Sequence, residues 1–418
     1  MTISLSHRRG RIMVGASAAI LAVAGFGIYG VTADDTDVAS VNVEFILGGG
    51  SDTNGTGDNL ATPGRYQGLA ASSDGTVYLF TQENDGMVMW QRKPSGAIKR
   101  TSLSGLDEAQ AEQAAVAPDG SVYLAADDLW RVDPRGKAVK VIDTDCKKHT
   151  PLATVISKFC TEQVTGVAVA EDGSVYIGDQ VIWGDDASYV HKVDGDSIEL
   201  MAGRPPKAGE SYELSNPAVK NGINPDPGTK ATDVLVSDNL NSGWLAMDGE
   251  GLYWRNGPGI VRINHDSTLS PFVAAESPEE ITEAESPFAG MGRARDAEIR
   301  RNVSDATRGD LAAIPGRSEV YYSDGGAKYK PTKDGSFRWR GIVSDSQEKL
   351  LDESGNGKAV YQVAGGKLAP VIAGVQALAT AADSLYIAVE SESGNDRDNP
   401  ENWNTAVLRV KLPAKKEH

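Results

Sequence analysis

The stretch AVAPDGSVYLAADDLWRV (residues 115–132) contains the pattern that decides the fold. An apolar run leads into an Asp-Gly turn, a Val-Tyr-Leu strand follows, and after a short gap comes a second strand, Leu-Trp-Arg-Val. Asp-Gly between alternating apolar residues indicates a tight β-hairpin, because glycine supplies the positive φ that such turns need. If this hairpin recurs along the chain, it predicts a repeat architecture.

The pattern occurs six times, and each copy carries a tyrosine in its second strand. The other copies are GLAASSDGTVYLF (68–80), GVAVAEDGSVYIGD (166–179), GWLAMDGEGLYWRN (243–256), DLAAIPGRSEVYYSD (310–324) and QALATAADSLYIAVE (376–390). The shared tyrosines are Tyr78, Tyr123, Tyr176, Tyr253, Tyr321 and Tyr386. A tyrosine at this repeated position is typical of packing between neighbouring sheets rather than of ligand contact.

A third strand of alternating pattern follows every copy, and a fourth strand follows five of them. The sixth copy ends with its third strand, AVLRVKL (406–412), whereas VEFILGGG (43–50) belongs to no unit and resembles the fourth strands SIELMAG and LAPVIAG. Pairing of these two segments would close a ring without exposed edges, and the alternative is an open solenoid. We expect closure. The predicted fold is an all-β, six-bladed β-propeller of four-stranded antiparallel blades, closed by pairing of the N-terminal strand with the last blade.

The repeats also carry a family resemblance. The run VAVAEDGSVYIGD…VHKVDGDSIELMAG, and the GTKATD spacer before WLAMDGEGLYW…GIVRINHDSTLSPFVA, resemble NHL repeats. The resemblance covers residues 41–412, which we take as one propeller domain, followed by a tail at 413–418. It implies a binding platform, since NHL propellers serve mainly in binding and only a few relatives are enzymes.

Residues 1–33 have the character of an export segment. Arg8, Arg9 and Arg11 precede the apolar run from Ile12 to Ala33, and small side chains end it. This pattern fits a cleaved signal peptide, and the run is also long enough for a transmembrane helix that anchors the protein. Both interpretations place the rest of the chain outside the cytoplasm, either secreted or anchored to the outer face of the membrane. The segment resembles bacterial ones.

The net charge disfavours some classes of binding partner, and the cysteine content bears on the compartment in which the protein works. The formal net charge of -17 opposes binding to nucleic acid or to an anionic membrane surface. We therefore expect membrane contact only through the N-terminal segment. The two cysteines, Cys146 and Cys160, would form a disulfide in an oxidising compartment, worth about 3 kcal/mol for a loop of about 15 residues. Two free buried thiols are the alternative.

Long insertions are predicted on one face of the propeller. In antiparallel blades the connections alternate between faces, and the turns from first to second and from third to fourth strands are all short. The other face receives the long connections, which are 48–64, 144–163, 179–188, 391–404 and the insertions 203–242, 275–308 and 325–357. Connections of this length are usually functional or disordered. Within 276–287, Ser277-Pro278-Glu279-Glu280 predicts a short helix.

Polar residues at the starts of the first strands would ring the mouth of the central channel on that face. They are Tyr66, Gln67, Glu112, Gln113, Thr165, Asp310 and Gln376. Amides outnumber carboxylates, so the set favours hydrogen bonding to a ligand over metal binding, and a rim that holds only water is the alternative. A divalent cation would need Glu112 and Asp310 to converge. We expect no cofactor. His191 is interpreted as a strand surface position, and the histidines show neither metal-ligand spacing nor a catalytic triad.

The segment KYKPTKDGSFRWRG (328–341) interleaves five basic residues with aromatics, including Arg338 and Trp339. This composition suits an acidic peptide or a glycan, and a solvated β-ribbon is the alternative interpretation. We expect a monomeric binding protein, not an enzyme, whose partner is an envelope or extracellular protein, peptide or glycan. The alternatives are a hydrolase or lactonase resembling gluconolactonase-like propellers, with a divalent cation at the channel mouth, and the sensor part of an envelope signalling system.

Overall fold

The structure is a computed structural model that describes residues 43–412 with gaps. The gaps are residues 55, 58–59, 107–110, 112, 146–148, 182–186, 208–225, 237–242, 250, 257–258, 274–310, 315–316, 318, 325–358, 365–366, 374–376, 382 and 393–398. The predicted export segment 1–33, the helix within 276–287 and the tail 413–418 therefore lie outside the described residues. Within the described residues, no helix is long and apolar enough to cross a membrane.

The described strands form six antiparallel sheets. Sheet 1 consists of β2 (Arg65–Ala71), β3 (Val77–Glu83), β4 (Gly86–Arg92) and β5 (Ile98–Ser102). Sheet 2 consists of β6 (Gln113–Val116), β7 (Val122–Ala126), β8 (Asp128–Val132) and β9 (Ala138–Ile142). Sheet 3 consists of β10 (Gln163–Val169), β11 (Val175–Val181), β12 (Ala187–Asp194) and β13 (Ser197–Ala202).

The second half of the chain repeats this order. Sheet 4 consists of β15 (Trp244–Asp248), β16 (Gly251–Asn256), β17 (Gly259–Asn264) and β18 (Thr268–Val273), with the short β14 (Thr229–Lys230) at its edge. Sheet 5 consists of β19 (Leu311–Ile314), β20 (Glu319–Asp324), β21 (Ala359–Ala364) and β22 (Lys367–Ala373). Sheet 6 consists of β23 (Ala377–Ala381), β24 (Ser384–Glu392), β25 (Trp403–Lys411) and β1 (Val43–Gly48). The described helices are 3-10 turns: η2 (Ile156–Lys158), η3 (Ala231–Asp233) and η5 (Pro400–Asn402).

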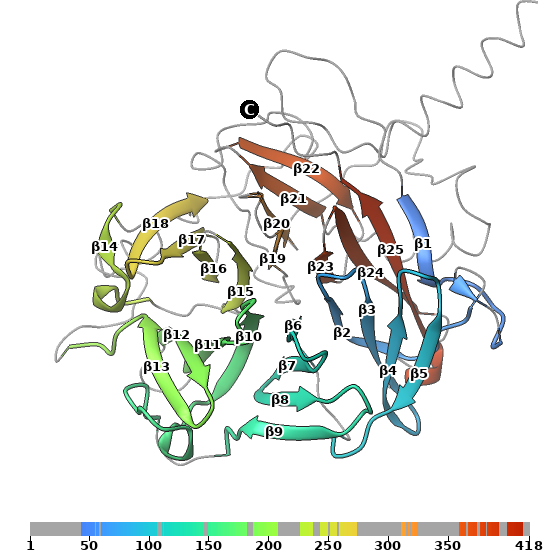
Figure 1. Cartoon of the computed structure of the whole chain (residues 1–418), viewed down its shortest axis with the longest axis horizontal. Helices are drawn as coiled ribbons and strands as arrows, with labels where there is room; N and C mark the ends of the chain where they lie inside the picture. Colours follow the sequence, from blue (N-terminus) through green and yellow to red (C-terminus); the bar gives the residue numbers. More distant parts are fainter. Residues whose placement is uncertain are drawn as a thin grey trace, which may run out of the picture.

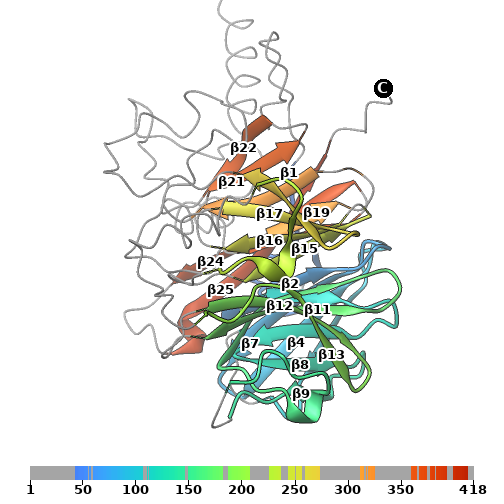
Figure 2. The same ribbon diagram turned by 90° about the vertical axis from the view of Figure 1, so that its left-hand side faces the viewer.

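The sheets are arranged around one axis (Figure 1). Each first strand contacts the first strand of the next sheet, and β23 of sheet 6 contacts β2 of sheet 1. In the side view, β9 and β22 lie at opposite ends of this arrangement (Figure 2). The chain is therefore a β-propeller with four-stranded antiparallel blades, as predicted.

The repeated tyrosines all pair with alanines of the first strands. The cross-strand pairs are Tyr78 with Ala70, Tyr123 with Ala115, Tyr176 with Ala168, Tyr253 with Ala246, Tyr321 with Ala312, and Tyr386 with Ala379. At these positions the first strand carries a small side chain, and the tyrosine ring of the second strand packs in the wider space between sheets. Burial raises the pKa of Tyr78 and Tyr386. This environment agrees with the predicted packing role.

Sheet 6 combines the two ends of the described chain. β1 pairs antiparallel with β25, from Val43 opposite Val410 to Gly48 opposite Ala406. Ile46 and Leu47 are completely buried in this contact. Gly48 has a φ of 76°, and a Cβ there would lie 2.5 Å from a backbone oxygen, so the close approach of the two strands requires glycine. The predicted pairing between the segments 43–50 and 406–412 is thus present.

Two predicted connections are shorter than expected because the strands continue into them. β11 extends to Val181 and β12 begins at Ala187, so sheet 3 takes up both ends of the predicted connection 179–188. β24 and β25 likewise extend into 391–404. Continued pairing satisfies backbone N–H and C=O groups that a loop would leave to water.

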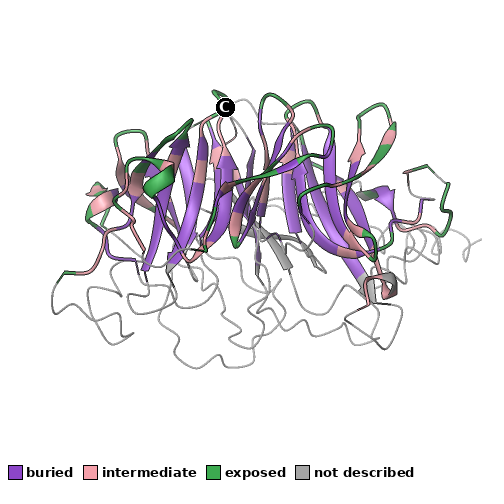
Figure 3. Cartoon of the chain, turned by 90° about the horizontal axis from the view of Figure 1, so that it is seen from below, coloured by how far each residue is buried: buried purple, intermediate pink, exposed green. Residues whose placement is uncertain are grey.

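One face of the disc carries tight turns, and we call it the hairpin face. Its turns from first to second strands place an aspartate before a glycine of positive φ, as in Asp119-Gly120 and Asp172-Gly173. The N–H of Ser121 donates to Asp119 and lowers the pKa of that carboxyl. Figure 3 shows exposed turns along one side of the buried strands. We call the opposite side, where first strands begin and fourth strands end, the connection face.

Removal of residues 1–48 should lower the free energy of unfolding by about 4 kcal/mol or more. The deletion removes the buried Phe45, Ile46 and Leu47, and burial of each such side chain contributes about 1.5–3 kcal/mol. Urea unfolding monitored by tryptophan fluorescence measures the change. Removal of residues 1–42 is the control, because it leaves β1 in place. Equal unfolding midpoints for the two truncations would show that the β1–β25 pairing contributes nothing.

Candidate functional site

Four of the predicted channel-mouth residues are described, and all four are buried. Tyr66, Gln67, Gln113 and Thr165 expose between 2% and 5% of their surface. They lie near the starts of β2, β6 and β10, as the repeat pattern predicts. Side chains buried to this extent need hydrogen-bond partners within the protein, so their contacts decide whether they remain available to a ligand.

Gln113 connects four sheets near the axis. Its Nε2 donates to the carbonyl oxygens of Leu245 at 2.6 Å and Leu311 at 3.1 Å. Its Oε1 accepts from the backbone N–H groups of Val167 at 3.0 Å and Leu245 at 2.9 Å. One side chain of β6 therefore binds β10, β15 and β19 together.

These four bonds use the whole hydrogen-bonding capacity of the Gln113 amide. A glutamine side chain has two N–H donors and two acceptor lone pairs, and all four are occupied by backbone groups. Gln113 was predicted to bind a ligand, but it has no donor or acceptor left for one. Its geometry supports a structural role, in which the side chain joins the first strands of four sheets.

The start of β2 depends on a carboxylate that sequence reasoning missed. The N–H of Tyr66 donates to Glu390 Oε1 at 2.7 Å, and Glu390 exposes only 7% of its surface. Glu390 stands at the end of an apolar strand before an acidic run, so its position resembled the beginning of a solvated loop. The residue after Tyr66 is Gln67, whose Oε1 is buried and makes no hydrogen bond. Among the described mouth residues, Gln67 thus has an acceptor that the protein does not use.

The remaining predicted site residues lie outside the described residues. They are Glu112, Asp310, Gln376, Arg338 and Trp339. Within the part of the chain that the structure describes, no group of three His, Cys, Asp or Glu residues is arranged to hold a metal ion. The cation site of Glu112 and Asp310 therefore stays a prediction.

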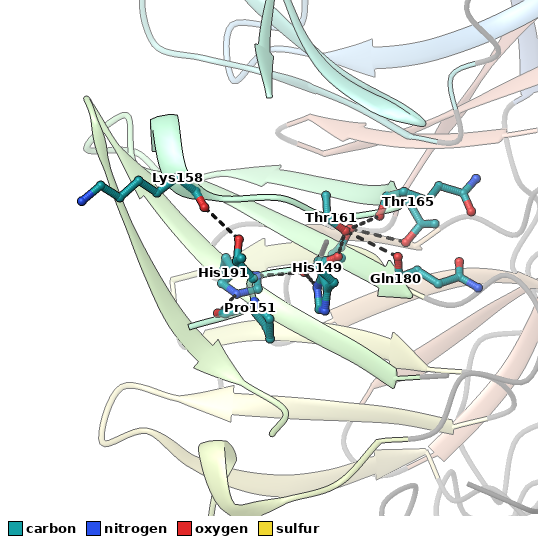
Figure 4. A network of polar contacts seen from close by, with 11 residues as sticks. His149, Pro151, Lys158, Thr161, Thr165, Gln180 and His191 are labelled. Carbon is teal, nitrogen blue, oxygen red and sulfur yellow. Dashed lines mark hydrogen bonds and ion pairs between the residues drawn. The ribbon is translucent and has the colours of Figure 1, made fainter. Parts of the chain in front are cut away.

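A second polar cluster lies in sheet 3, under the connection from β9 to β10. We call residues 149–162 of this connection the strap. Backbone bonds attach it to the turn before β13, from the Ile156 N–H to Asp196 at 2.9 Å and from the Ile198 N–H to Thr154 at 3.2 Å. Its side chains meet those of β11 and β12 in the network of Figure 4. The strap is thus held against the sheet by both main-chain and side-chain contacts.

His191 of β12 is at the centre of this network and is completely buried. The prediction of a strand surface position was wrong. The His191 Nε2 lies 2.8 Å from the carbonyl oxygen of Pro151, and its Nδ1 lies 3.6 Å from Asp179 Oδ2. Asp179, also completely buried, contacts His149 Nε2 at 3.3 Å and accepts a hydrogen bond from the Thr161 hydroxyl. Two histidines and one carboxylate therefore share a site that is nearly closed to solvent.

The burial of His191 had a weak signal in the sequence. Its neighbours on the same strand face, Tyr189 and Val193, are apolar and belong to that face by the alternation of a strand. Both faces of β12 are covered, however, so the alternation between core and solvent on which the prediction relied is absent. Part of its cover comes from the strap, which follows a different sheet in sequence.

Cys160 lies at the end of the strap and is buried. Cys146 is outside the described residues, so the disulfide between these two residues remains a prediction. A bridge there would close the connection that contains His149 and Pro151.

No protein-family model matches the sequence, and no curated protein matches it at a significant level. Among solved structures, the chain is similar to virginiamycin B lyase from Staphylococcus aureus, with 11% identity and a TM-score of 0.40 over 89% of this chain and 99% of that one. It is also similar to the gluconolactonase XC5397 from Xanthomonas campestris, with 11% identity and a TM-score of 0.43 over 90% of each chain. A Bacteroides thetaiotaomicron protein of unknown function shows 12% identity and a TM-score of 0.47, over 91% of this chain and 78% of that one. Similarity at this level carries no conclusion about activity.

Replacement of Gln113 by glutamate should destabilise the protein by about 3 kcal/mol at pH 7.5. The carboxylate cannot donate to Leu245 or Leu311, and it places a charge in a buried site. Burial raises the pKa of the new carboxyl above its unfolded value of about 4.3, so the loss should grow as pH rises above that value. Urea unfolding at pH 4.5 and pH 7.5 measures both effects.

Gln91→Glu is the matched control for this substitution. Gln91 Nε2 donates to the Tyr78 hydroxyl at 3.3 Å, and a carboxylate at the same place can accept from that hydroxyl instead. We expect little change in stability for this variant. If both glutamate variants unfold at the same urea concentration, the four bonds of Gln113 do not hold the sheets together.

Proposed function

We propose that this protein is an exported binding protein, built as a six-bladed propeller of NHL-like repeats and closed by its first and last strands. Its connection face recognises an acidic peptide or an anionic glycan, which is free or part of an envelope or extracellular protein. The protein acts as a monomer. The N-terminal segment 1–33 directs export and is the part that meets the membrane.

The observation that carries this proposal is that polar side chains near the axis bind backbone groups of neighbouring sheets. All donors and acceptors of the Gln113 amide bind backbone groups of three other sheets. Glu390 accepts a hydrogen bond from the N–H of Tyr66. Polar groups at the axis that hold the sheets are poorly suited to bind and release a substrate. A ligand is therefore expected at the rim and on the surface around it.

The connectivity supports the connection face as the binding surface. Long stretches of sequence separate β18 from β19, β20 from β21, and β13 from β15, the last with only the two-residue β14 between them. In antiparallel sheets of this order, these strands end and begin on the same side of the disc. The insertions 203–242, 275–308 and 325–357 would then enlarge one face, while the hairpin face keeps tight turns.

The charge of one insertion supports an acidic partner. The chain carries 58 acidic and 41 basic residues, yet residues 328–340 hold five lysines and arginines beside three aromatic rings. Guanidinium groups pair with carboxylates in a bidentate manner, and aromatic rings add contact area at low entropic cost. Arg338 and Trp339 are the residues that we expect to contribute most.

The double substitution Arg338→Glu and Trp339→Ala should weaken binding at least tenfold. The test uses residues 34–418 and two probes, a polyglutamate peptide and polygalacturonate, with neutral dextran as the uncharged reference. Biolayer interferometry gives the dissociation constants. Binding of the wild type to a charged probe but not to dextran, lost in the double variant, supports the proposal.

Arg135→Glu is the matched control, because Arg135 is an exposed arginine in the turn between β8 and β9 on the hairpin face. It should bind like the wild type. Equal loss in both variants would show a non-specific charge effect, and no loss in either would overturn the proposed surface. A stoichiometric, tightly held metal that disappears in Asp310→Ala would instead favour the hydrolase alternative.

A further inference from the structure

The contact between the strap and sheet 3 includes titratable side chains beside backbone hydrogen bonds and apolar contacts. The titratable groups that face His191 within the described residues are Asp179 from β11, His149 from the strap and Tyr189 from β12. The His149 ring lies 5.3 Å from the Tyr189 ring. On the other side, the Phe159 ring of the strap meets the His191 ring edge to face at 4.8 Å. The strap thus covers His191 with one aromatic and one titratable ring.

The hydrogen-bond partners of the two histidine rings indicate which ring nitrogens carry a proton at neutral pH. A carbonyl oxygen only accepts, so the His191 Nε2 carries a proton and donates it to Pro151. His149 donates from its Nε2 to Asp179, and the Thr161 hydroxyl donates to the other carboxylate oxygen. The His191 Nδ1 makes no hydrogen bond and faces Asp179 Oδ2 at 3.6 Å. A neutral His191 therefore leaves one bare nitrogen in the closed site.

Adding a proton to that nitrogen creates a charge that the closed site solvates poorly. His191 is completely buried, and the apolar Phe159 ring occupies one of its sides. Burial lowers the pKa of His191 below its ordinary value near 6.5, and the nearby Asp179 opposes this effect only in part. The neighbouring His149 also lowers the pKa of His191. Water can reach the ring only when the groups that cover it, Pro151, Phe159 and His149, move away.

The sign of the pH dependence follows from this arrangement. His191 binds a proton less readily in the closed site than in an open one, so acid favours the open form. The stability of the closed strap is fully present above about pH 6.5 and is lost as the pH falls through the lower pKa of the buried ring. Phe159 of the strap packs into the core between sheets 2 and 3, whereas the hydrophobic clusters between the other sheets contain, among the described residues, none from the strap.

We propose that the strap is an acid-released latch, which the protonation of His191 frees from sheet 3 while the propeller stays folded. Opening exposes Tyr189 and Phe159 on the outer side of sheets 2 and 3. The strap is itself one of the connections between sheets, but the latch does not depend on the proposed binding function, since its residues 149–162 and 191 include neither Arg338 nor Trp339.

Hydrogen exchange measured by mass spectrometry tests the latch in residues 34–418. Exchange at pH 5.0 and pH 7.5, corrected for the intrinsic pH dependence of amide exchange, is compared for peptides covering 150–159 and peptides covering β6–β8. The strap amides of Ile156 and Phe159 should lose protection at least tenfold at pH 5.0, while β6–β8 keeps its protection. Equal protection of the strap at both pH values overturns the proposal, and so does loss of protection in both regions together.

His191→Gln removes the titration but keeps a donor near the position of Nε2. In this variant the protection of the strap should no longer depend on pH. His265→Gln is the matched control, because His265 is an exposed histidine in the turn between β17 and β18, and this variant should behave like the wild type. An unchanged pH dependence in His191→Gln also overturns the proposal. If this variant does not fold, the NMR titration of the His191 ring in the wild type decides, since the latch requires ring protonation and strap opening at the same pH.

Discussion

The fold depends on the narrow space in which the six first strands meet. Their alanines at the axis pair with tyrosines that point into the wider gaps between sheets, and this size difference recurs in every sheet. Between sheets 3 and 4 the space is so narrow that backbone atoms of the two sheets come close to each other. A Cβ at Gly166 or Gly178 would lie within 2 Å of the Gly243 carbonyl oxygen, so larger residues there would force the two sheets apart.

Small residues allow the first strands to approach, and larger first-strand side chains such as Leu69, Trp244 and Leu311 pack between the sheets. Two directional contacts add to this packing. The amide of Gln113 joins β6 to β10, β15 and β19, and β1 supplies the outer strand of sheet 6 from the opposite end of the chain. The β1–β25 pairing adds buried apolar side chains as well as backbone hydrogen bonds. Closure therefore comes from contacts between residues that are far apart in sequence.

These structural demands also shape where chemistry can occur. The polar groups near the axis are buried, and most of their hydrogen bonds are made within the protein. The turns of the hairpin face are short, and their aspartate side chains accept hydrogen bonds from the backbone of the same turn. In sheet 3 the strap brings two histidines and a carboxylate together. The two surfaces for which we propose a role, the connection face and the strap, are built from connections between sheets rather than from the repeated strands.

The sequence by itself determined the repeat, the propeller fold and the pairing of its ends. Hydrophobic alternation, Asp-Gly turns and the recurring tyrosine are local features, and local features repeat visibly along a chain. The tertiary structure alone decided what the polar residues do. Gln113 has its role because β10, β15 and β19 surround it, and His191 is buried because a connection from sheet 2 covers it. The physical reason is that hydrogen-bond partners and burial depend on neighbours in space, and no pattern in the adjacent residues specifies which distant segment those neighbours come from.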